Sequence, residues 1–201
     1  MLVRDRPGAR LVLIGFHGYT ENAEIQMARL AAVAGDEHWT LVSAQGLHRF
    51  YRGKTPEISA SWMTRQDRDD MIADNIEYAD RIVDAVVKPP AKIVTLGFSQ
   101  GVAMAFRAAL RGRVHADAVV AVGGDIPPEL LADPGIQFPS LLLARGETDD
   151  WYTASKLDND VTALRARGIT PATSVYPGGH AWTDAIGSRA HDFIVETFGE
   201  G

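Results

Sequence analysis

The chain of 201 residues contains no cysteine. Disulfide bonds, thiolate metal sites and a cysteine nucleophile are therefore excluded. Basic residues are in deficit, because 20 Lys and Arg stand against 26 Asp and Glu and leave a net charge of -6. Phosphate contacts need clustered Lys and Arg, and the chain has no such cluster, so nucleic acid is not expected as a partner.

Long hydrophobic runs are absent as well. The first ten residues mix charges with Pro7 and Gly8, and the apolar run that follows is confined to Leu11–Phe16. A signal peptide needs roughly 7–15 apolar residues and a membrane span needs about 20. We therefore expect a cytoplasmic protein that does not bind membranes. The chain also lacks metal-ligand spacings such as H-E-x-x-H and glycine-rich phosphate loops, so no metal and no cofactor are expected.

Short apolar runs alternate with longer amphipathic stretches along the whole chain. Continuous runs rich in Val, Ile and Leu are typical of parallel strands buried on both faces. They occupy residues 11–16, 40–44, 92–97, 117–122, 140–144 and 173–176. This alternation predicts one α/β domain over residues 1–201, with a mostly parallel sheet of about six to seven strands and helices on both faces.

Helical periodicity is clearest between the second and third of these runs, and two long stretches lack any periodicity. An apolar face predicts a helix that begins within residues 67–70 and ends before Pro89 and Pro90. Further helices are predicted around Leu157–Leu164 and Trp182–Phe198. Residues 45–61 and 123–139 are longer than ordinary connections, and we expect them to be loops that border a binding site.

A candidate nucleophile lies at residues 97–101, which read Gly-Phe-Ser-Gln-Gly and match G-x-S-x-G. A predicted strand precedes the match and a predicted helix follows it, which is the setting of a nucleophile elbow. The two glycines leave room for the sharp turn that would present Ser99. The alternative is a serine that only caps the helix in a tight turn.

A serine hydroxyl needs a base, and in this arrangement an acid and then a histidine follow it in the chain. Only His115, His180 and His191 follow Ser99. His115 precedes a predicted strand, on the wrong side of the sheet, and His191 lies inside the predicted last helix. His180 follows the last strand, where ligand chemistry takes place in open α/β sheets, and is the predicted base.

The acid is expected between Ser99 and His180, in the loop after residues 140–144. Glu147, Asp149 and Asp150 crowd this loop. Asp149 is our first choice to accept the imidazole N–H, Asp150 is the second and Glu147 the third.

An oxyanion hole requires two backbone N–H donors. One is expected from Gln100, which follows the nucleophile, and the other from Tyr19 in the loop after the first strand of the pattern. His17 lies in the same loop and is expected to support it rather than to act in catalysis.

Together these segments resemble the phospholipase/carboxylesterase family of the α/β-hydrolase superfamily, which includes the acyl-protein thioesterases. The resemblance covers almost the whole chain and is carried by F-H-G at 16–18, G-F-S-Q-G at 97–101, G-E-T-D at 146–149 and G-G-H at 178–180. It implies the α/β-hydrolase fold. It matches Ser99, Asp149 and His180 to the family triad, and Tyr19 and Gln100 to the family oxyanion donors.

The resemblance also points to the pocket. Ser61-Trp62 and Gly123–Pro127 are similar to family segments that border it, and the pocket candidates are Trp62, Ile126, Trp151 and Trp182. The chain departs from the family in having Thr20 where H-G-x-G has its second glycine, and in having larger, more polar residues at 150–152. Its shortness implies a minimal hydrolase without a lid domain.

The expected function is that of a serine carboxylesterase, which hydrolyses small carboxylic esters or thioesters through an acyl-enzyme on Ser99. Two alternatives remain open. A serine acyltransferase, perhydrolase or lactonase would use the same triad, and a non-catalytic ligand-binding homologue would share only the fold. A small-molecule ester is the expected partner, and the sequence does not predict the oligomeric state.

Overall fold

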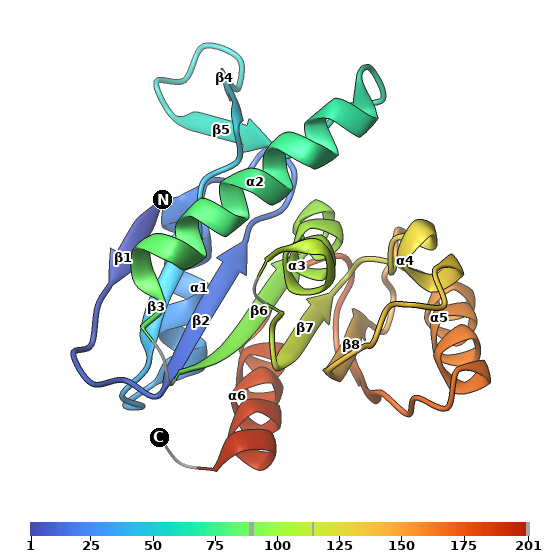
Figure 1. The fold of residues 1–201 in the computed structure, drawn as a ribbon. Helices are drawn as coiled ribbons and strands as arrows, with labels where there is room; N and C mark the ends of the chain where they lie inside the picture. Colours follow the sequence, from blue (N-terminus) through green and yellow to red (C-terminus); the bar gives the residue numbers. More distant parts are fainter. Residues whose placement is uncertain (89–90, 114, 200–201) are drawn as a thin grey trace.

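A parallel sheet forms the centre of the molecule in the computed structural model, which describes residues 1–88, 91–113 and 115–199 (Figure 1). Within these ranges the sheet has seven strands in the order β1-β3-β2-β6-β7-β8-β9. Neighbouring strands pair in parallel except β1, which is antiparallel to β3. The predicted sheet is thus confirmed. Its strands are β1 (Leu2–Arg4), β2 (Leu11–Phe16), β3 (Thr40–Ala44), β6 (Lys92–Phe98), β7 (Ala118–Val122), β8 (Ser140–Gly146) and β9 (Ala172–Tyr176).

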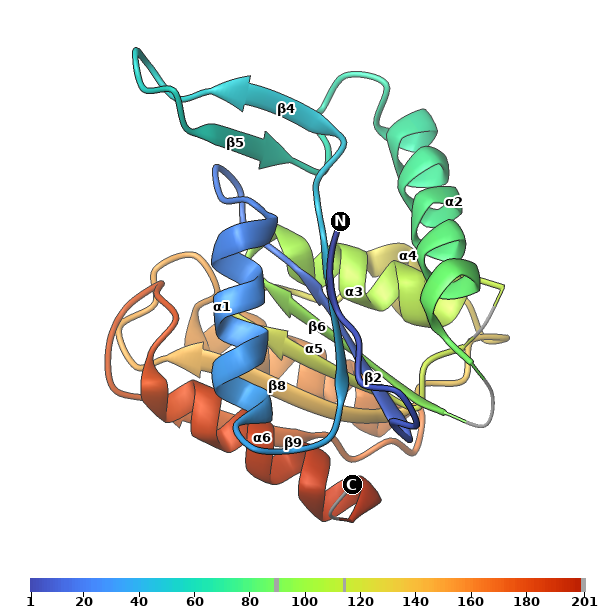
Figure 2. The same ribbon diagram turned by 90° about the vertical axis from the view of Figure 1, so that its left-hand side faces the viewer.

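Helices cover both faces of this sheet. One face carries α1 (Ala23–Ala34) and α6 (Asp184–Phe198), and Figure 2 shows α2 (Arg68–Val86) and α3 (Gln100–Arg111) on the other. The short α4 (Pro128–Ala132) and α5 (Ala154–Ala166) pack into the same core as α3. None of the described helices is long and apolar enough to cross a membrane.

Two hydrophobic cores result, one on each face. Alternate residues of β2 point to opposite sides, so that Val12 and Ile14 enter the core beneath α3 while Leu11 and Leu13 enter the core beneath α1 and α6. Every residue of β2 is buried. This double burial explains why the strands read as continuous apolar runs rather than as alternating patterns.

Several elements differ from the expectation. Strand β1 and helix α1 were not predicted, because β1 is a short, largely exposed edge strand and the buried face of α1 includes the polar Gln26. Residues 45–61 are not an irregular loop but contain the antiparallel hairpin of β4 (His48–Tyr51) and β5 (Ile58–Ser61), which projects from the sheet (Figure 1).

Helix α4 lies within residues 123–139, which were expected to be a loop, whereas α2, α3, α5 and α6 match their predictions closely. Helix α2 begins at Arg68 as expected, and Pro89 and Pro90, which were expected to follow its end, lie outside the described residues. Trp182 precedes α6 instead of lying within it. All parallel strands end at the same edge of the sheet, so the loops after β2, β6, β7, β8 and β9 gather there.

Candidate active site

The turn between β6 and α3 holds Ser99 in a strained conformation. Its φ of 52° and ψ of -119° lie outside the regions that non-glycine residues normally occupy. A Cβ on Gly97 would lie 2.4 Å from the carbonyl oxygen of Gly101, and a Cβ on Gly101 would lie 2.1 Å from that of Phe16. Glycine is therefore a steric requirement at both positions. The Ser99 side chain makes no capping hydrogen bond to α3, which disfavours the reading of Ser99 as a simple helix cap.

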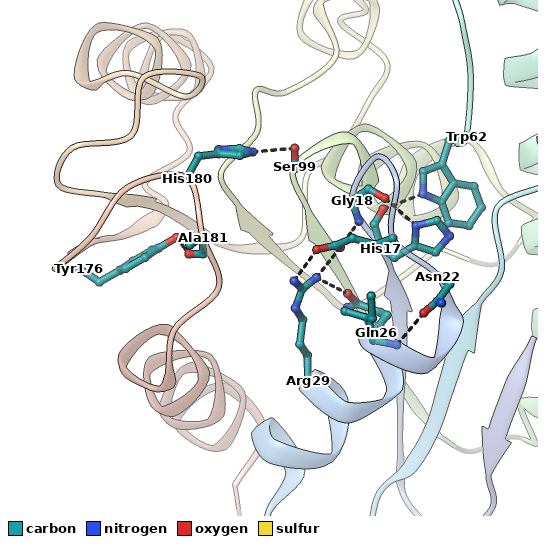
Figure 3. Close-up of polar contacts among 12 residues, drawn as sticks. His17, Gly18, Asn22, Gln26, Arg29, Trp62, Ser99, Tyr176, His180 and Ala181 are labelled. Atoms are coloured by element: carbon teal, nitrogen blue, oxygen red, sulfur yellow. Dashed lines mark hydrogen bonds and ion pairs between the residues drawn. The ribbon is translucent and has the colours of Figure 1, made fainter. Parts of the chain in front are cut away.

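Ser99 and His180 meet at the carboxyl edge of the sheet (Figure 3). The Ser99 Oγ and His180 Nε2 are 2.8 Å apart, and His180 Nδ1 lies 2.9 Å from Asp149 Oδ2. A proton on Nδ1 that donates to Asp149 leaves Nε2 free to accept the serine proton. The loops after three different strands thus bring together three residues that are 81 and 31 positions apart in the chain.

The loop after β8, here called the acid loop, carries the three candidate carboxylates, and of these Asp149 contacts His180. The Asp149 side chain is 0% exposed, and its Oδ1 accepts the backbone N–H groups of Trp151 and Tyr152, both at 2.9 Å. Glu147 and Asp150 are exposed. The two amides orient one carboxylate oxygen, so the other is held toward the imidazole.

The two predicted oxyanion donors are the backbone N–H groups of Tyr19 and Gln100. Tyr19 and Gln100 both border the same cavity as Ser99. Neither backbone N–H has an acceptor in the described part of the chain. The Gln100 side chain is engaged elsewhere, because its Oε1 accepts the Trp62 N–H at 2.9 Å and its Nε2 donates to the Met63 carbonyl at 3.0 Å.

The oxyanion loop, residues 17–22, contains the departure noted in the sequence. Thr20 has a φ of 64°, the left-handed conformation for which glycine is suited. Such a conformation costs a residue with a Cβ about 1–2 kcal/mol. Hydrogen bonds offset this cost: the Thr20 N–H donates to the Ala60 carbonyl at 3.0 Å, and the Ala60 N–H donates to the Glu21 carbonyl at 2.8 Å.

His17 is the first residue of this loop, and it does not border the cavity. Its Nε2 accepts the Gly46 N–H at 3.0 Å, so its proton is on Nδ1, which donates to the Gly18 carbonyl at 2.7 Å. Burial lowers the pKa of His17, which favours this neutral form. The Trp62 Nε1–H donates to the His17 carbonyl at 2.8 Å (Figure 3). Both side chains therefore donate hydrogen bonds to backbone carbonyl groups of the loop.

A cavity of about 540 Å³ opens beside Ser99 and His180. Besides Ser99, His180, Tyr19 and Gln100, its walls are formed by Ala103, Gly123, Gly124, Asp125, Trp151 and Lys156. Lys156 and Asp125 form an ion pair of 3.2 Å. Trp151 is 71% exposed and stands at the rim. A larger depression of about 710 Å³ lies at the amino ends of the strands, beside Arg10 and Thr40, far from these residues.

Three of the four pocket candidates lie outside this cavity. Trp62 is fully buried behind the oxyanion loop, and Ile126 is buried with its N–H directed to Asp160 at 3.3 Å. Trp182 packs edge-on against Phe98, with ring centroids 6.3 Å apart. These predictions are corrected: the aromatic and aliphatic surfaces are used for packing, and only Trp151 borders the cavity.

Sequence reasoning also missed wall residues on two helices. Ala103 lies one helical turn beyond Ser99 on α3, and Lys156 lies in the first turn of α5. A search of the first turn of each helix that follows a site loop would have found both.

A buried carboxyl group connects the acid loop with the loop after β7. Asp160 on α5 accepts the Tyr152 hydroxyl at 2.8 Å and the Ile126 N–H at 3.3 Å through the same oxygen, Oδ2. Burial raises the pKa of Asp160 to about 6. Tyr152 in turn donates its backbone N–H to Asp149. The predicted catalytic acid is thus linked through Tyr152 to a second, buried carboxyl group.

Known proteins share this fold over nearly their whole length. Esterase PE8 is 24% identical, and the match covers 96% of this chain and 95% of that chain with a TM-score of 0.73. Zea mays acyl-protein thioesterase 2 is 16% identical over 98% and 97%, with a TM-score of 0.75. A carboxylesterase of Bacillus cereus is 17% identical over 98% and 93%, with a TM-score of 0.73. These low identities show a common fold. No curated protein matches the chain.

The sequence itself matches a family model. The model described as Phospholipase/Carboxylesterase matches residues 3–169, which include the elbow and the acid loop and end before His180. The seven-stranded, mostly parallel sheet is that of the α/β-hydrolase fold. The chain therefore belongs to the phospholipase/carboxylesterase family of α/β-hydrolases.

Proposed function

We propose that the protein is a serine carboxylesterase that hydrolyses small carboxylic esters or thioesters through an acyl-enzyme on Ser99. The observation that carries this proposal is the continuous contact from Ser99 through His180 to Asp149, at the wall of a cavity. The shared fold with esterases and a thioesterase supports the same reaction class.

The acylation step follows from the geometry. Ser99 Oγ attacks the substrate carbonyl while His180 Nε2 takes the serine proton, and Asp149 stabilises the imidazolium. The negative charge that develops on the carbonyl oxygen is stabilised by the N–H groups of Tyr19 and Gln100. The tetrahedral intermediate collapses when His180 donates its proton to the leaving alcohol or thiol.

Deacylation repeats these roles with water. His180 removes a proton from the water that attacks the acyl carbonyl, and the same proton returns to Ser99 Oγ when the carboxylic acid leaves. These steps need only side chains and backbone amides, so the proposed reaction requires no metal and no cofactor. The open cavity of about 540 Å³ suits a small ester.

The test is a rate panel of aryl esters and thioesters of increasing acyl length, with wild type and Ser99→Ala. We expect saturable hydrolysis of the short acyl chains, and a decrease in kcat of at least about 10³-fold in Ser99→Ala. Ser188→Ala, at an exposed position of α6, is the matched control and should leave kcat unchanged. Undiminished ester hydrolysis by a folded Ser99→Ala would refute the proposal. Product analysis with alcohol or peroxide present would reveal acyl transfer instead of hydrolysis.

A further inference from the structure

An ion pair stands directly behind the oxyanion loop. Arg29 on α1 points toward the loop segment that carries His17 and Gly18 (Figure 3). Its Nη1 and Nη2 each donate to one carboxylate oxygen of Glu21 at 2.6 Å, and the two side chains are only 13% and 19% exposed. Bidentate pairs of this kind fix orientation as well as distance.

The carboxylate of this pair also holds the backbone of the loop. Glu21 Oε2 accepts the Gly18 N–H at 2.7 Å. The Gly18 N–H belongs to the His17–Gly18 peptide group, so this bond fixes the peptide group that directly precedes the one carrying the Tyr19 N–H. Arg29 thus fixes Glu21, and Glu21 fixes the chain at the proposed oxyanion donor.

The same guanidinium contacts the other two catalytic segments. Arg29 Cζ lies 4.5 Å from the ring centroid of Phe98 and 5.4 Å from that of Trp182. Phe98 directly precedes Ser99, and its ring stacks on the His180 imidazole with centroids 5.4 Å apart. Trp182 follows His180 by two residues. One side chain therefore contacts the residue before the nucleophile, a residue two positions after the base and, through Glu21, the residue before the oxyanion donor.

The strain at Thr20 explains why the loop needs this support. A threonine at a φ of 64° gains by leaving that conformation. Such a change would rotate the neighbouring peptide groups and misdirect the Tyr19 N–H. Oxyanion donors act only when they are held in place before the charge develops.

We propose that Glu21 and Arg29 are positioning residues for acyl transfer, which hold the Tyr19 N–H in the orientation that meets the oxyanion. This inference rests on the proposed esterase function. Neither side chain borders the cavity, so neither contacts the substrate. Their loss should therefore lower kcat and leave KM nearly unchanged.

The experiment measures kcat and KM of Arg29→Met and Glu21→Gln with a short aryl ester, at a temperature at which both variants are folded by circular dichroism. We expect kcat to fall by about 10- to 100-fold with KM changed less than about twofold, the pattern of a lost transition-state interaction. The matched control is Arg81→Met, which removes the exposed Arg81–Glu77 pair on α2 and should leave both constants unchanged.

The Thr20→Gly background provides a second measurement, which distinguishes positioning of the oxyanion loop from a purely structural role of Arg29. Glycine adopts the left-handed conformation without strain, so the loop depends less on its support. Arg29→Met should therefore lower kcat by a smaller factor in the Thr20→Gly background than in wild type. An equal or larger factor in the glycine background would overturn the proposal.

The remaining outcomes separate this inference from the function on which it rests. A wild-type protein without esterase activity overturns both. An active wild type with an unchanged kcat in folded Arg29→Met, or a change confined to KM, overturns the positioning role alone. If Arg29→Met does not fold, Glu21→Gln decides, because it keeps an acceptor oxygen and removes only the charge; an unchanged kcat there also overturns the inference.

Discussion

The nucleophile elbow and the oxyanion loop each place a residue with a Cβ at positive φ, Ser99 at 52° and Thr20 at 64°, but different forces hold them. In the elbow, backbone packs against backbone so closely that Gly97 and Gly101 have no room for a Cβ. In the oxyanion loop, hydrogen bonds and the Glu21–Arg29 pair hold the chain. Steric contact leaves the elbow no alternative conformation, whereas a polar support can be loosened one group at a time. Substitutions of the two elbow glycines should therefore destabilise the fold, and substitutions in the polar loops should lower the reaction rate or remove a part of the stability.

Gly101→Ala is the largest expected effect. The new methyl group would lie 2.1 Å from the Phe16 carbonyl oxygen, so β2 and α3 must separate, and we expect a loss of more than about 4 kcal/mol or failure to fold. Gly187→Ala on α6 is the control, because its Cβ would meet nothing closer than 3.8 Å, and it should stabilise by about 0.5–1 kcal/mol. Thermal unfolding measures both. A normal melting temperature in Gly101→Ala would show that the elbow is not sterically fixed.

Asp149→Asn tests the polar acid loop. The amide can no longer accept the imidazole N–H as a charged partner, so kcat should fall by about 10³–10⁴-fold while the fold persists. The exposed neighbour provides the comparison, since Asp150→Asn should change kcat less than about threefold. Steady-state kinetics on both variants checks this pair, and a larger loss in Asp150→Asn would reassign the acid.

Asp160 tests how much stability is lost when a buried carboxyl group that supports the acid loop becomes ionised. Burial raises its pKa from 3.8 to about 6, so the folded protein binds this proton more tightly than the unfolded chain does. The free energy of unfolding should therefore fall as the pH rises from about 4 to about 6, by at most about 3 kcal/mol. Denaturant unfolding of Asp160→Asn should lack this contribution, and its stability relative to wild type should rise across that window.

The control is Asp158→Asn, whose side chain is exposed on the same helix. Its stability should follow the pH dependence of wild type. If Asp160→Asn also follows wild type, the Asp160 carboxyl group does not titrate in this range and its burial imposes no such cost.

Thr20 offers the smallest and most specific effect. Thr20→Gly and Thr20→Ala both remove the branched side chain, but only glycine relieves the positive φ. The glycine variant should be more stable than the alanine variant by about 1 kcal/mol in denaturant unfolding. Equal stability of the two variants would mean that the loop is not strained at this position.

Much of this architecture could be predicted because its physical requirements restrict which residue types can occupy each position. Strands buried on both faces must be continuous apolar runs, as in Leu11–Phe16. A sharp turn without room for a Cβ must have glycine, as at Gly97 and Gly101. The position of His180 after the last strand followed from the parallel sheet alone.

The remaining features depend on contacts that no local pattern encodes. Asp149 differs from Asp150 in its burial and in its contacts with His180 and with the amides of Trp151 and Tyr152, which are properties of the folded loop. Trp62 was expected in the pocket because Ser61-Trp62 resembles a family segment that borders it, yet its indole donates to the His17 carbonyl and is fully buried.

The Glu21–Arg29 pair joins a loop residue to a helix residue eight positions later, and its carboxylate holds the Gly18 N–H. Helical or strand periodicity does not indicate such a contact. Its contacts with Phe98 and Trp182 depend on how α1 packs against the loops that carry Ser99 and His180.

The central claim is that Ser99 is a nucleophile activated by His180. The most direct measurement treats the native protein with a fluorophosphonate and maps the adduct by peptide mass spectrometry. The geometry predicts one stoichiometric adduct on Ser99, with labelling that slows by orders of magnitude in His180→Ala. A native, folded protein that takes no adduct, or that carries it on another residue, would contradict the claim.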